Sequence, residues 1–309
     1  MKRTRKPGQK KQFKKASAIL TGDWHLREDT PLCRVDDYWE EQWRKVDFIS
    51  DLQIKHQCPV LHSGDLFNHW KPSPYLLTKT IEFLPDKFYT IFGNHDLPQN
   101  NIEMREKCGI EVLSRTGVLS VLTGHHWNQS HPKKTIIPSG LNIFQKKVLV
   151  WHVMVWQGNQ PWPGCTDPEA NKLLRNTKGF DLILTGHNHK AFVVEQDGRL
   201  LINPGSIIRM SADQIDYKPR VYLWFEEDNT VKPVYIPIDP SGVVAVSRVH
   251  LEQVKERDDR IEAFITKLNM DWSTEVSFRK NLDEFFSNNP VPGKVKDLVW
   301  KSLEANNGK

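Results

Sequence analysis

The chain has 309 residues, of which 38% are hydrophobic and 26% are charged, and its formal net charge at pH 7 is +5. Its longest apolar runs have the length of strands and are interrupted, which argues against a membrane-spanning helix. The basic amino terminus is not followed by the apolar region of a secretory signal, so we expect a soluble protein of the cytoplasm. The four cysteines have no paired spacing, which favours free thiols over disulfides: Cys33, Cys58, Cys108 and Cys165.

Basic side chains are concentrated at the amino terminus. Residues 1–15 contain eight lysines and arginines and no acidic residue, so the rest of the chain carries a negative net charge. We expect a disordered leader there, which either contacts the phosphates of a nucleic acid or only increases solubility.

Five short strings of chemically active residues each follow an apolar run. The apolar runs, which read as buried strands, cover residues 16–20, 59–61, 88–92, 148–150 and 182–184. The strings are Gly22-Asp23-Trp24-His25, Gly64-Asp65, Gly93-Asn94-His95-Asp96, Trp151-His152 and Gly186-His187-Asn188-His189. One residue separates Asp23 from His25, and the same spacing separates His187 from His189, so in an extended segment each pair points to one side. We expect these side chains to converge on one edge of a sheet.

The segments between and after the strings predict a layered α/β fold. Apolar spacing predicts a helix over residues 34–56, a second over 73–84 that starts at Ser73-Pro74, and a third near 170–177. Further strands are predicted over residues 199–202, 220–225 and 231–238. The architecture is therefore one of central β-sheets flanked by helices, in a domain spanning residues 16–240.

After Pro240 the sequence becomes polar and helix-forming, with three apolar stripes. The stripes predict a short helical appendage over residues 241–309, whose helices pack on each other or on a partner. The stripe residues are Val254, Ile261, Phe264, Ile265 and Leu268; Val276, Leu282, Phe285 and Phe286; and Val295, Leu298, Val299 and Leu303.

The donor types in the five strings suit a pair of metal ions. Two cations roughly 3.5–4 Å apart can activate a water molecule and clamp the attacking and leaving oxygens of a phosphate ester. Carboxylate and imidazole donors without cysteine favour manganese, iron or zinc, whereas magnesium alone prefers fewer imidazoles. Taken singly, a strand-end histidine is more often structural, but five of the twelve histidines lie in these strings.

The order of the strings and the residues in them resemble the motifs of the calcineurin-like metallophosphoesterases and, within this superfamily, of the SbcD-type DNA repair nucleases. Gly64-Asp65-Leu66-Phe67 and Asn203-Pro204-Gly205-Ser206 are similar to that subgroup in particular. The resemblance covers about residues 16–240 and implies a metallophosphoesterase fold for this catalytic domain. One departure is Asn68, where the subgroup often has an acid.

The resemblance also implies a role for each site residue. It implies a first metal ion held by Asp23, His25 and His189. Asp65 would bridge to a second metal ion, whose other ligands would be Asn94, His152 and His187. His95 would contact the scissile phosphate and assist the leaving oxygen, and Asp96 would orient His95 or a neighbouring ligand.

The function expected from this resemblance is that of a two-metal phosphodiester hydrolase, a DNA exonuclease or endonuclease, with Mn²⁺ as the favoured ion and Fe, Zn or Mg as alternatives. DNA and an SbcC-type coiled-coil ATPase are the expected partners, and dimerisation is left open. One alternative is a phosphoesterase for small nucleotides or phosphoproteins, because substrate choice depends on loops. Another is a non-catalytic DNA-binding subunit, against which the intact set of ligands argues.

Some of the eleven tryptophans are candidates for contact with substrate. We expect Trp24 to form a wall of the metal pocket and Trp151 to pack in the core. Trp70, Trp156 and Trp162 fall in predicted loops, where they could stack on bases or pack structurally. Residues 157–165, directly after His152, are a candidate substrate-binding flap.

Overall fold

The computed structural model describes residues 14–123, 125–127, 144–238, 245–247, 249 and 278–306. The chain divides into two compact units, residues 1–248 and residues 249–309. Most of the predicted leader lies outside the described residues. So do the first apolar stripe of the predicted appendage, Val254 to Leu268, and Val276 of the second stripe.

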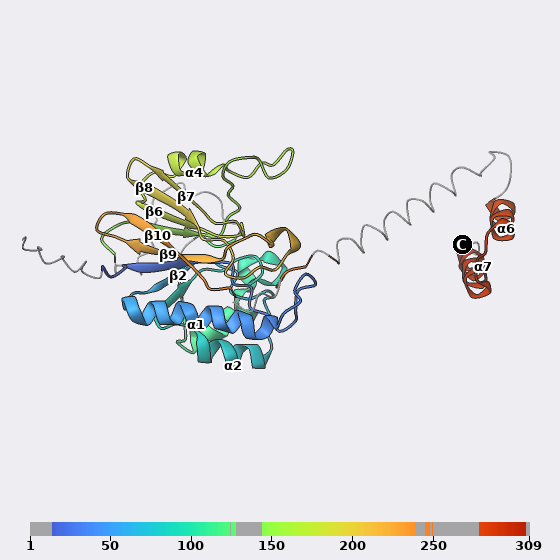
Figure 1. Ribbon diagram of the computed structural model, residues 1–309, viewed down its shortest axis with the longest axis horizontal. Helices are drawn as coiled ribbons and strands as arrows, with labels where there is room; N and C mark the ends of the chain where they lie inside the picture. Colours follow the sequence, from blue (N-terminus) through green and yellow to red (C-terminus); the bar gives the residue numbers. More distant parts are fainter. Residues whose placement is uncertain are drawn as a thin grey trace, which may run out of the picture. The chain divides into compact units, whose positions relative to one another are not determined.

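The first unit contains two mixed β-sheets packed face to face (Figure 1). The strands of the larger sheet are β1 (Ala18–Thr21), β2 (Val60–His62), β3 (Phe88–Thr90), β4 (Ser120–Val121), β9 (Arg220–Phe225) and β10 (Thr230–Tyr235), and their order is β10-β9-β1-β2-β3-β4. The strands of the smaller sheet are β5 (Val148–Trp151), β6 (Leu182–Thr185), β7 (Phe192–Gln196) and β8 (Arg199–Asn203), in the order β5-β6-β8-β7. Strands β1 to β4 are parallel to one another, as are β5, β6 and β8. Each sheet therefore brings the carboxyl ends of its parallel strands to one edge.

Helices cover the outer faces of the two sheets. The α-helices that the structure describes in this unit are α1 (Tyr38–His56), α2 (Pro74–Phe83), α3 (Gly109–Arg115) and α4 (Ala170–Asn176). In Figure 1, α1 and α2 lie beside the larger sheet and α4 lies over the smaller one. Short 3₁₀ helices span Pro98–Asn100, Ile102–Lys107 and Ala212–Gln214. This arrangement confirms the predicted layered α/β fold.

Side chains at two helix starts explain where the helices begin. The Ser73 side chain accepts a hydrogen bond from the Leu76 amide, and Pro74 follows it, as the sequence predicts for α2. Helix α1 begins four residues later than predicted, because the Asp37 side chain caps it by accepting from the Glu40 amide. Arg34 instead forms an antiparallel bridge with Val246.

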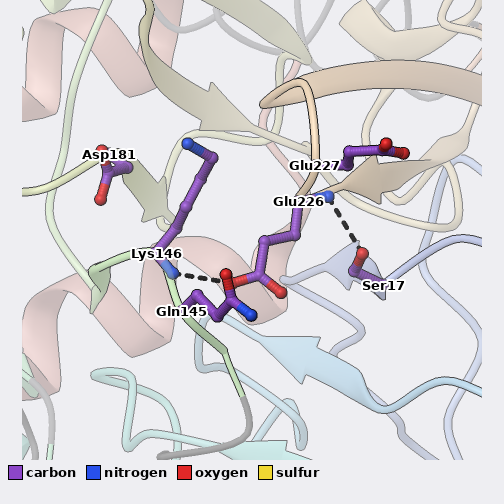
Figure 2. A pocket seen from close by; sticks show the side chains of 6 residues that line it. All are labelled: Ser17, Gln145, Lys146, Asp181, Glu226 and Glu227. Carbon is purple, nitrogen blue, oxygen red and sulfur yellow. Dashed lines mark hydrogen bonds between the residues drawn. The ribbon is translucent and has the colours of Figure 1, made fainter.

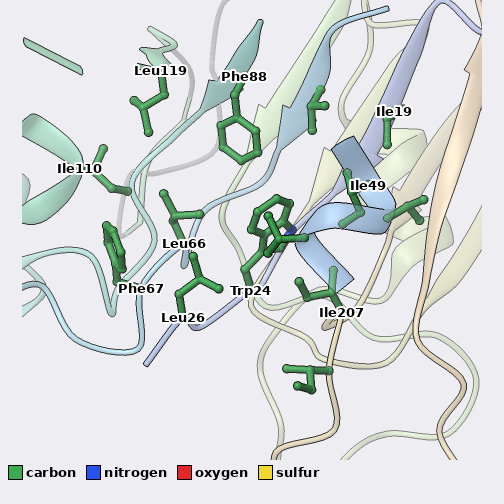
Figure 3. Packing of buried hydrophobic residues seen from close by; sticks show 14 of the residues in the cluster. Ile19, Trp24, Leu26, Ile49, Leu66, Phe67, Phe88, Ile110, Leu119 and Ile207 are labelled. Atoms are coloured by element: carbon green, nitrogen blue, oxygen red, sulfur yellow. The ribbon is translucent and has the colours of Figure 1, made fainter. Parts of the chain in front are cut away.

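Successive side chains point to opposite faces of each strand and so contribute to three different hydrophobic clusters. In β6, Leu182 and Leu184 pack between the sheets, whereas Ile183 packs toward α4. On the outer face of the larger sheet, Ile19 packs with Ile49 of α1 in a third cluster (Figure 3). Trp24 lies in this cluster with 0% of its surface exposed, edge-on to Phe88. The prediction that Trp24 forms a wall of the metal pocket is therefore wrong, whereas Trp151 is buried in β5 as predicted.

Within residues 278–306 of the second unit the structure describes two helices, α6 (Phe278–Asn288) and α7 (Gly293–Asn306). The ring of Phe286 meets the indole of Trp300 edge-on at 5.9 Å, and the Lys296 ammonium donates to the Phe286 carbonyl oxygen at 2.7 Å. These contacts show that the two helices pack on each other. Among the helices that the structure describes, none combines the length and apolar character needed to cross a membrane.

Candidate metal centre

The predicted ligands lie just beyond the carboxyl ends of five parallel strands. Asp23 and His25 follow β1, Asp65 follows β2, and Asn94 follows β3 in the larger sheet. In the smaller sheet, His152 follows β5, while His187 and His189 follow β6. The structure brings these residues together, as the sequence predicts. The ligands come from two sheets, however, and not from one edge of a single sheet.

The first cluster consists of Asp23, His25 and His189, whose donor atoms all lie within 4.8 Å of one another. The Nε2 atoms of His25 and His189 are 3.0 Å apart. Asp23 uses Oδ1 to accept a hydrogen bond from the His187 amide at 2.9 Å. Its other oxygen, Oδ2, is buried and has no hydrogen-bond partner within the described part of the chain. A cation would satisfy this buried oxygen.

The second cluster consists of Asp65, His152 and His187, again with donor atoms within 4.8 Å. The side-chain oxygen of Asn94 lies 3.1 Å from His152 Nε2 and 2.8 Å from His187 Nδ1. Two imidazole nitrogens and two oxygens therefore face one small space, which is a donor set that suits a transition-metal ion.

Asp65 lies between the two clusters. Its Oδ2 is 3.6 Å from His25 Nε2 in the first cluster and 3.4 Å from His152 Nε2 in the second. Its Oδ1 accepts a hydrogen bond from the main-chain amide of His95 at 2.9 Å. The carboxylate of Asp65 is thus in the position that a bridging ligand requires.

Asp96 holds the turn that carries Asp65. Its Oδ2 accepts hydrogen bonds from the amides of Asp65 at 2.7 Å and Gly93 at 3.0 Å, and its Oδ1 accepts from the amide of Phe67 at 3.1 Å. The side chain of Asp96 is only 1% exposed. Of the two roles expected for Asp96, these contacts favour orientation of a neighbouring ligand, Asp65, over orientation of the His95 imidazole.

His95 is exposed at the rim of the two clusters. Its ring lies edge-on to that of His25, with centroids 4.6 Å apart. Its Nδ1–H donates to the main-chain oxygen of Asn68 at 2.9 Å, so the other ring nitrogen, Nε2, remains for a substrate. This hydrogen bond uses the main chain of Asn68. It therefore does not depend on whether residue 68 is asparagine, as here, or an acid, as is common in the resembled subgroup. His95 is also close enough to group with His25 and Asp65 as a third set of donors.

Four predicted ligands have backbone angles in the left-handed region: φ is 51° at Asp23, 48° at His25, 58° at Asp65 and 75° at His187. Residues other than glycine rarely adopt this conformation, and each instance costs on the order of 1–3 kcal/mol. Neighbouring elements must therefore hold these ligands in place. Gly93 is one such neighbour of Asp65. It packs so closely on this ligand that a Cβ added to Gly93 would lie 2.0 Å from Asp65 Oδ1.

Burial and mutual charge set the protonation of the clusters. Burial lowers the pKa of His187 to about 4 and lowers that of His25 and His189, so these imidazoles are neutral, as metal ligands must be. Burial also acts to lower the pKa of His152, but the Asp65 carboxylate outweighs it and raises this pKa to about 9. Burial raises the pKa of Asp23 to about 8, against the opposing effect of His152. Three imidazoles are therefore neutral and ready to bind a cation, whereas Asp23 and His152 must each lose a proton first.

Trp127 is a site residue that the sequence analysis missed. Its indole stacks on the His187 ring with centroids 4.5 Å apart and an interplanar angle of 29°, and it meets His152 edge-on at 5.8 Å. The Trp127 amide donates to the carbonyl oxygen of Phe92 at 3.1 Å, which places it beside the end of β3. Trp127 is distant from every ligand string in sequence, so no local signal could have identified it.

The structure describes all three predicted base-stacking tryptophans. Trp70 packs against His69, and Trp162 is 49% exposed. Trp156 lines a cavity of about 550 Å³ at the base of the predicted flap, where its indole N–H donates to the Asp167 carbonyl oxygen at 2.9 Å. Whether these side chains contact substrate stays a prediction.

A second hollow lies at the amino ends of β1, β5 and β6, the edge opposite the metal ligands. It has a volume of about 580 Å³ and a polar lining, which Figure 2 shows: Ser17, Gln145, Lys146, Asp181, Glu226 and Glu227. The Glu226 amide donates to Ser17 Oγ at 3.0 Å, and the Lys146 amide donates to Glu226 Oε1 at 2.7 Å (Figure 2). None of the predicted ligands lines this hollow.

Comparison with known proteins identifies the family of the chain. The sequence profile of the calcineurin-like phosphoesterase superfamily domain matches residues 20–228. The DNA double-strand break repair protein Mre11 of Saccharolobus solfataricus is 25% identical over 248 residues, which cover 69% of this chain and 62% of that protein. The chain thus matches less than two thirds of the length of this relative.

Two solved structures are similar to part of the chain. An archaeal phosphodiesterase is 12% identical with a TM-score of 0.39, over 71% of this chain and 98% of that one. Vacuolar protein sorting 29 of Cryptosporidium parvum is 18% identical with a TM-score of 0.34, over 71% of this chain and 95% of that one. The match of the sequence profile over two thirds of the residues identifies the chain as a member of the calcineurin-like phosphoesterase superfamily.

Proposed function

We propose that this chain is a two-metal phosphodiester hydrolase that cleaves DNA. The position of Asp65 is the observation that carries the proposal. One oxygen of its carboxylate lies 3.6 Å from an imidazole nitrogen of the first cluster and 3.4 Å from one of the second. A shared carboxylate between two sets of nitrogen and oxygen donors is what a pair of closely spaced cations requires.

Each cluster would hold one divalent cation. Asp23, His25 and His189 would hold the first, while Asn94, His152 and His187 would hold the second, with Asp65 shared between them. The donor types favour Mn²⁺ over Mg²⁺, because Mg²⁺ is bound mainly by oxygen. When bound, the pair would supply an activated water nucleophile and neutralise the charge that develops on the phosphate.

His95 would assist the leaving oxygen. Its Nδ1–H is held by the Asn68 carbonyl oxygen at 2.9 Å, which directs Nε2 away from that segment. Once protonated, Nε2 can contact a phosphate oxygen and then donate its proton to the departing sugar oxygen. Because His95 is exposed at the rim, a polymeric substrate could reach it without entering an enclosed pocket.

Two observations favour DNA as the substrate. The curated relative is named a DNA double-strand break repair protein. The chain also carries eight basic residues and no acidic residue over positions 1–15, a charge that would bind nucleic-acid phosphates. We further propose that the second unit, residues 249–309, docks a coiled-coil ATPase of the SbcC type.

The test is Mn²⁺-dependent cleavage of linear duplex DNA and single-stranded DNA, measured beside bis-p-nitrophenyl phosphate. His95→Gln serves as the catalytic control, because it removes the proton donor and leaves both clusters intact. DNA cleavage that this variant lacks would support the nuclease. Turnover of the small ester alone would favour a small-substrate phosphoesterase, and hydrolysis of neither substrate would contradict an enzymatic role for the isolated chain.

A further inference from the structure

Asn203, the last residue of β8, lies directly behind the loop that carries His187 and His189. Its side chain is completely buried. Strand β8 pairs in parallel with β6, so Asn203 comes beside the residue that precedes the loop. It is not placed to act as a metal ligand, because both polar atoms of its carboxamide are engaged by protein atoms.

Every polar atom of the Asn203 carboxamide is used to hold this loop. The amide nitrogen donates to the main-chain oxygens of Asn188 and Lys190, the second at 2.8 Å. The amide oxygen accepts from the hydroxyl of Thr185 at 3.1 Å. One side chain therefore contacts the loop before His187, between His187 and His189, and after His189.

This arrangement requires an amide. Two carbonyl oxygens face Asn203, so the side chain must present two N–H donors. A carboxylate has the same shape but no donor, and it would leave two buried carbonyl oxygens unpaired and opposed by negative charge. The loop also contains His187 at a positive φ of 75°, a conformation that needs external support.

We propose that Asn203 is a positioning residue for both metal sites. The inference rests on the proposed metal centre and adds to it one residue that touches neither cation. Asn203 fixes the loop so that His187 faces the second cluster and His189 faces the first, 3.0 Å from His25. Loss of its hydrogen bonds would loosen one ligand of each cation at once. Residues that orient metal ligands in this way typically contribute about 10–100-fold to metal affinity.

The chain offers a matched control in Asn229. Its amide nitrogen donates to the main-chain oxygens of Asp181 at 3.0 Å and Gly198 at 2.8 Å, and its amide oxygen accepts from the Trp224 indole at 2.9 Å. Asn229 is also buried, with 7% of its surface exposed. It therefore makes the same number and type of hydrogen bonds, but at the amino end of β6, away from the ligands.

The experiment compares Asn203→Asp with Asn229→Asp in the full chain. Mn²⁺ binding is measured by isothermal titration calorimetry, and the unfolding temperature is measured without metal. We expect both variants to unfold at lower temperature, but only Asn203→Asp to bind both Mn²⁺ ions about 10–100-fold more weakly. Wild-type affinity in Asn203→Asp, or equal weakening in Asn229→Asp, would overturn the inference.

Thr185→Val is a milder second variant, for use if Asn203→Asp does not fold. It removes the hydroxyl that donates to Asn203 and keeps both donors of the carboxamide. We expect weaker Mn²⁺ binding in the same direction but of smaller size, and unchanged binding would again overturn the inference. Absence of Mn²⁺ binding by the wild-type chain would instead contradict the proposed metal centre itself.

Discussion

The Nδ1–H of His152 donates a hydrogen bond to the main-chain oxygen of Ser63 at 2.7 Å, and this contact joins the strand ends of the two sheets. It also fixes which ring nitrogen faces the second cluster. Nε2 points toward Asp65 and Asn94, at 3.4 Å and 3.1 Å. The orientation of this ligand is therefore set by the other sheet.

Metal binding should strengthen as the pH rises from 6 to 9. The pKa of His152 is raised to about 9 and that of Asp23 to about 8, so both groups carry a proton at neutral pH and must lose it to bind a cation. Below these pKa values, affinity should fall by up to about tenfold per pH unit for each displaced proton, and above pH 9 it should level off. Calorimetry in buffers of different ionisation enthalpy would measure the proton release, and affinity that does not change with pH would contradict this assignment.

Asp65→Asn should lose both metal ions, whereas His189→Gln should lose mainly one. Asp65 is shared between the clusters, but His189 belongs to the first alone. Metal content can be measured by mass spectrometry after dialysis against Mn²⁺ and gel filtration. Retention of two ions by Asp65→Asn would show that its carboxylate does not bridge them.

His95→Gln should abolish phosphodiester hydrolysis while leaving metal content near that of the wild type. A protonated imidazole can donate a proton to the leaving oxygen, which the glutamine amide cannot do, and general acid catalysis of this kind contributes about 10²–10⁴-fold. His69→Gln is the matched control, since His69 is another exposed histidine nearby, and its ring packs on Trp70. Equal activity of the two variants would show that His95 takes no part in catalysis.

The convergence of the ligands was predictable because it follows from local patterns. Each string follows a short apolar run, and the ends of parallel strands meet at one edge, so Asp23, Asp65 and Asn94 of the larger sheet could be placed together from the sequence. That His152 joins them from the second sheet depends on how the two sheets pack. The roles assigned to these residues as ligands stay predictions. The sequence also indicated the cap of α2 through Ser73 and Pro74.

What the sequence could not reveal depends on contacts between distant segments. Trp24 adjoins two ligands in the chain but points into the core, and Trp127 is distant in sequence but stacks on His187. Strand β7 was missed, although its five residues pair with β8 through a turn at Asp197 and Gly198. For the two tryptophans the outcome depends on which face of the backbone meets another element, and local sequence does not specify that. Strand β7, by contrast, had a local signal, because Asp197-Gly198 between two apolar runs is typical of a hairpin.

Gly93→Ala should displace Asp65 and weaken metal binding. The added methyl group would lie 2.0 Å from Asp65 Oδ1 and 2.5 Å from the Asp65 amide nitrogen, so the turn must move. Such overpacking costs about 1–3 kcal/mol of stability. Gly293→Ala is the control, because no atom lies within 4 Å of its added Cβ. Thermal unfolding with and without Mn²⁺ would check both effects, and a stabilisation by Mn²⁺ equal to that of the wild type would contradict the displacement of Asp65.

Removal of residues 2–13 should reduce the salt dependence of DNA binding. Two of the eight basic residues in the predicted leader are kept in this variant, because Lys14 contacts Asp228 and Lys15 contacts Gln57. The deleted segment contains the other six basic residues and no acidic residue. Each phosphate contact contributes about 0.9 to the slope of log affinity against log salt on duplex DNA, so the slope should decrease by up to about 5. Binding would be measured by fluorescence anisotropy between about 50 and 200 mM salt. An unchanged slope would show that these side chains make no phosphate contacts, and the proposal of DNA as substrate would then rest on the curated relative and on cleavage itself.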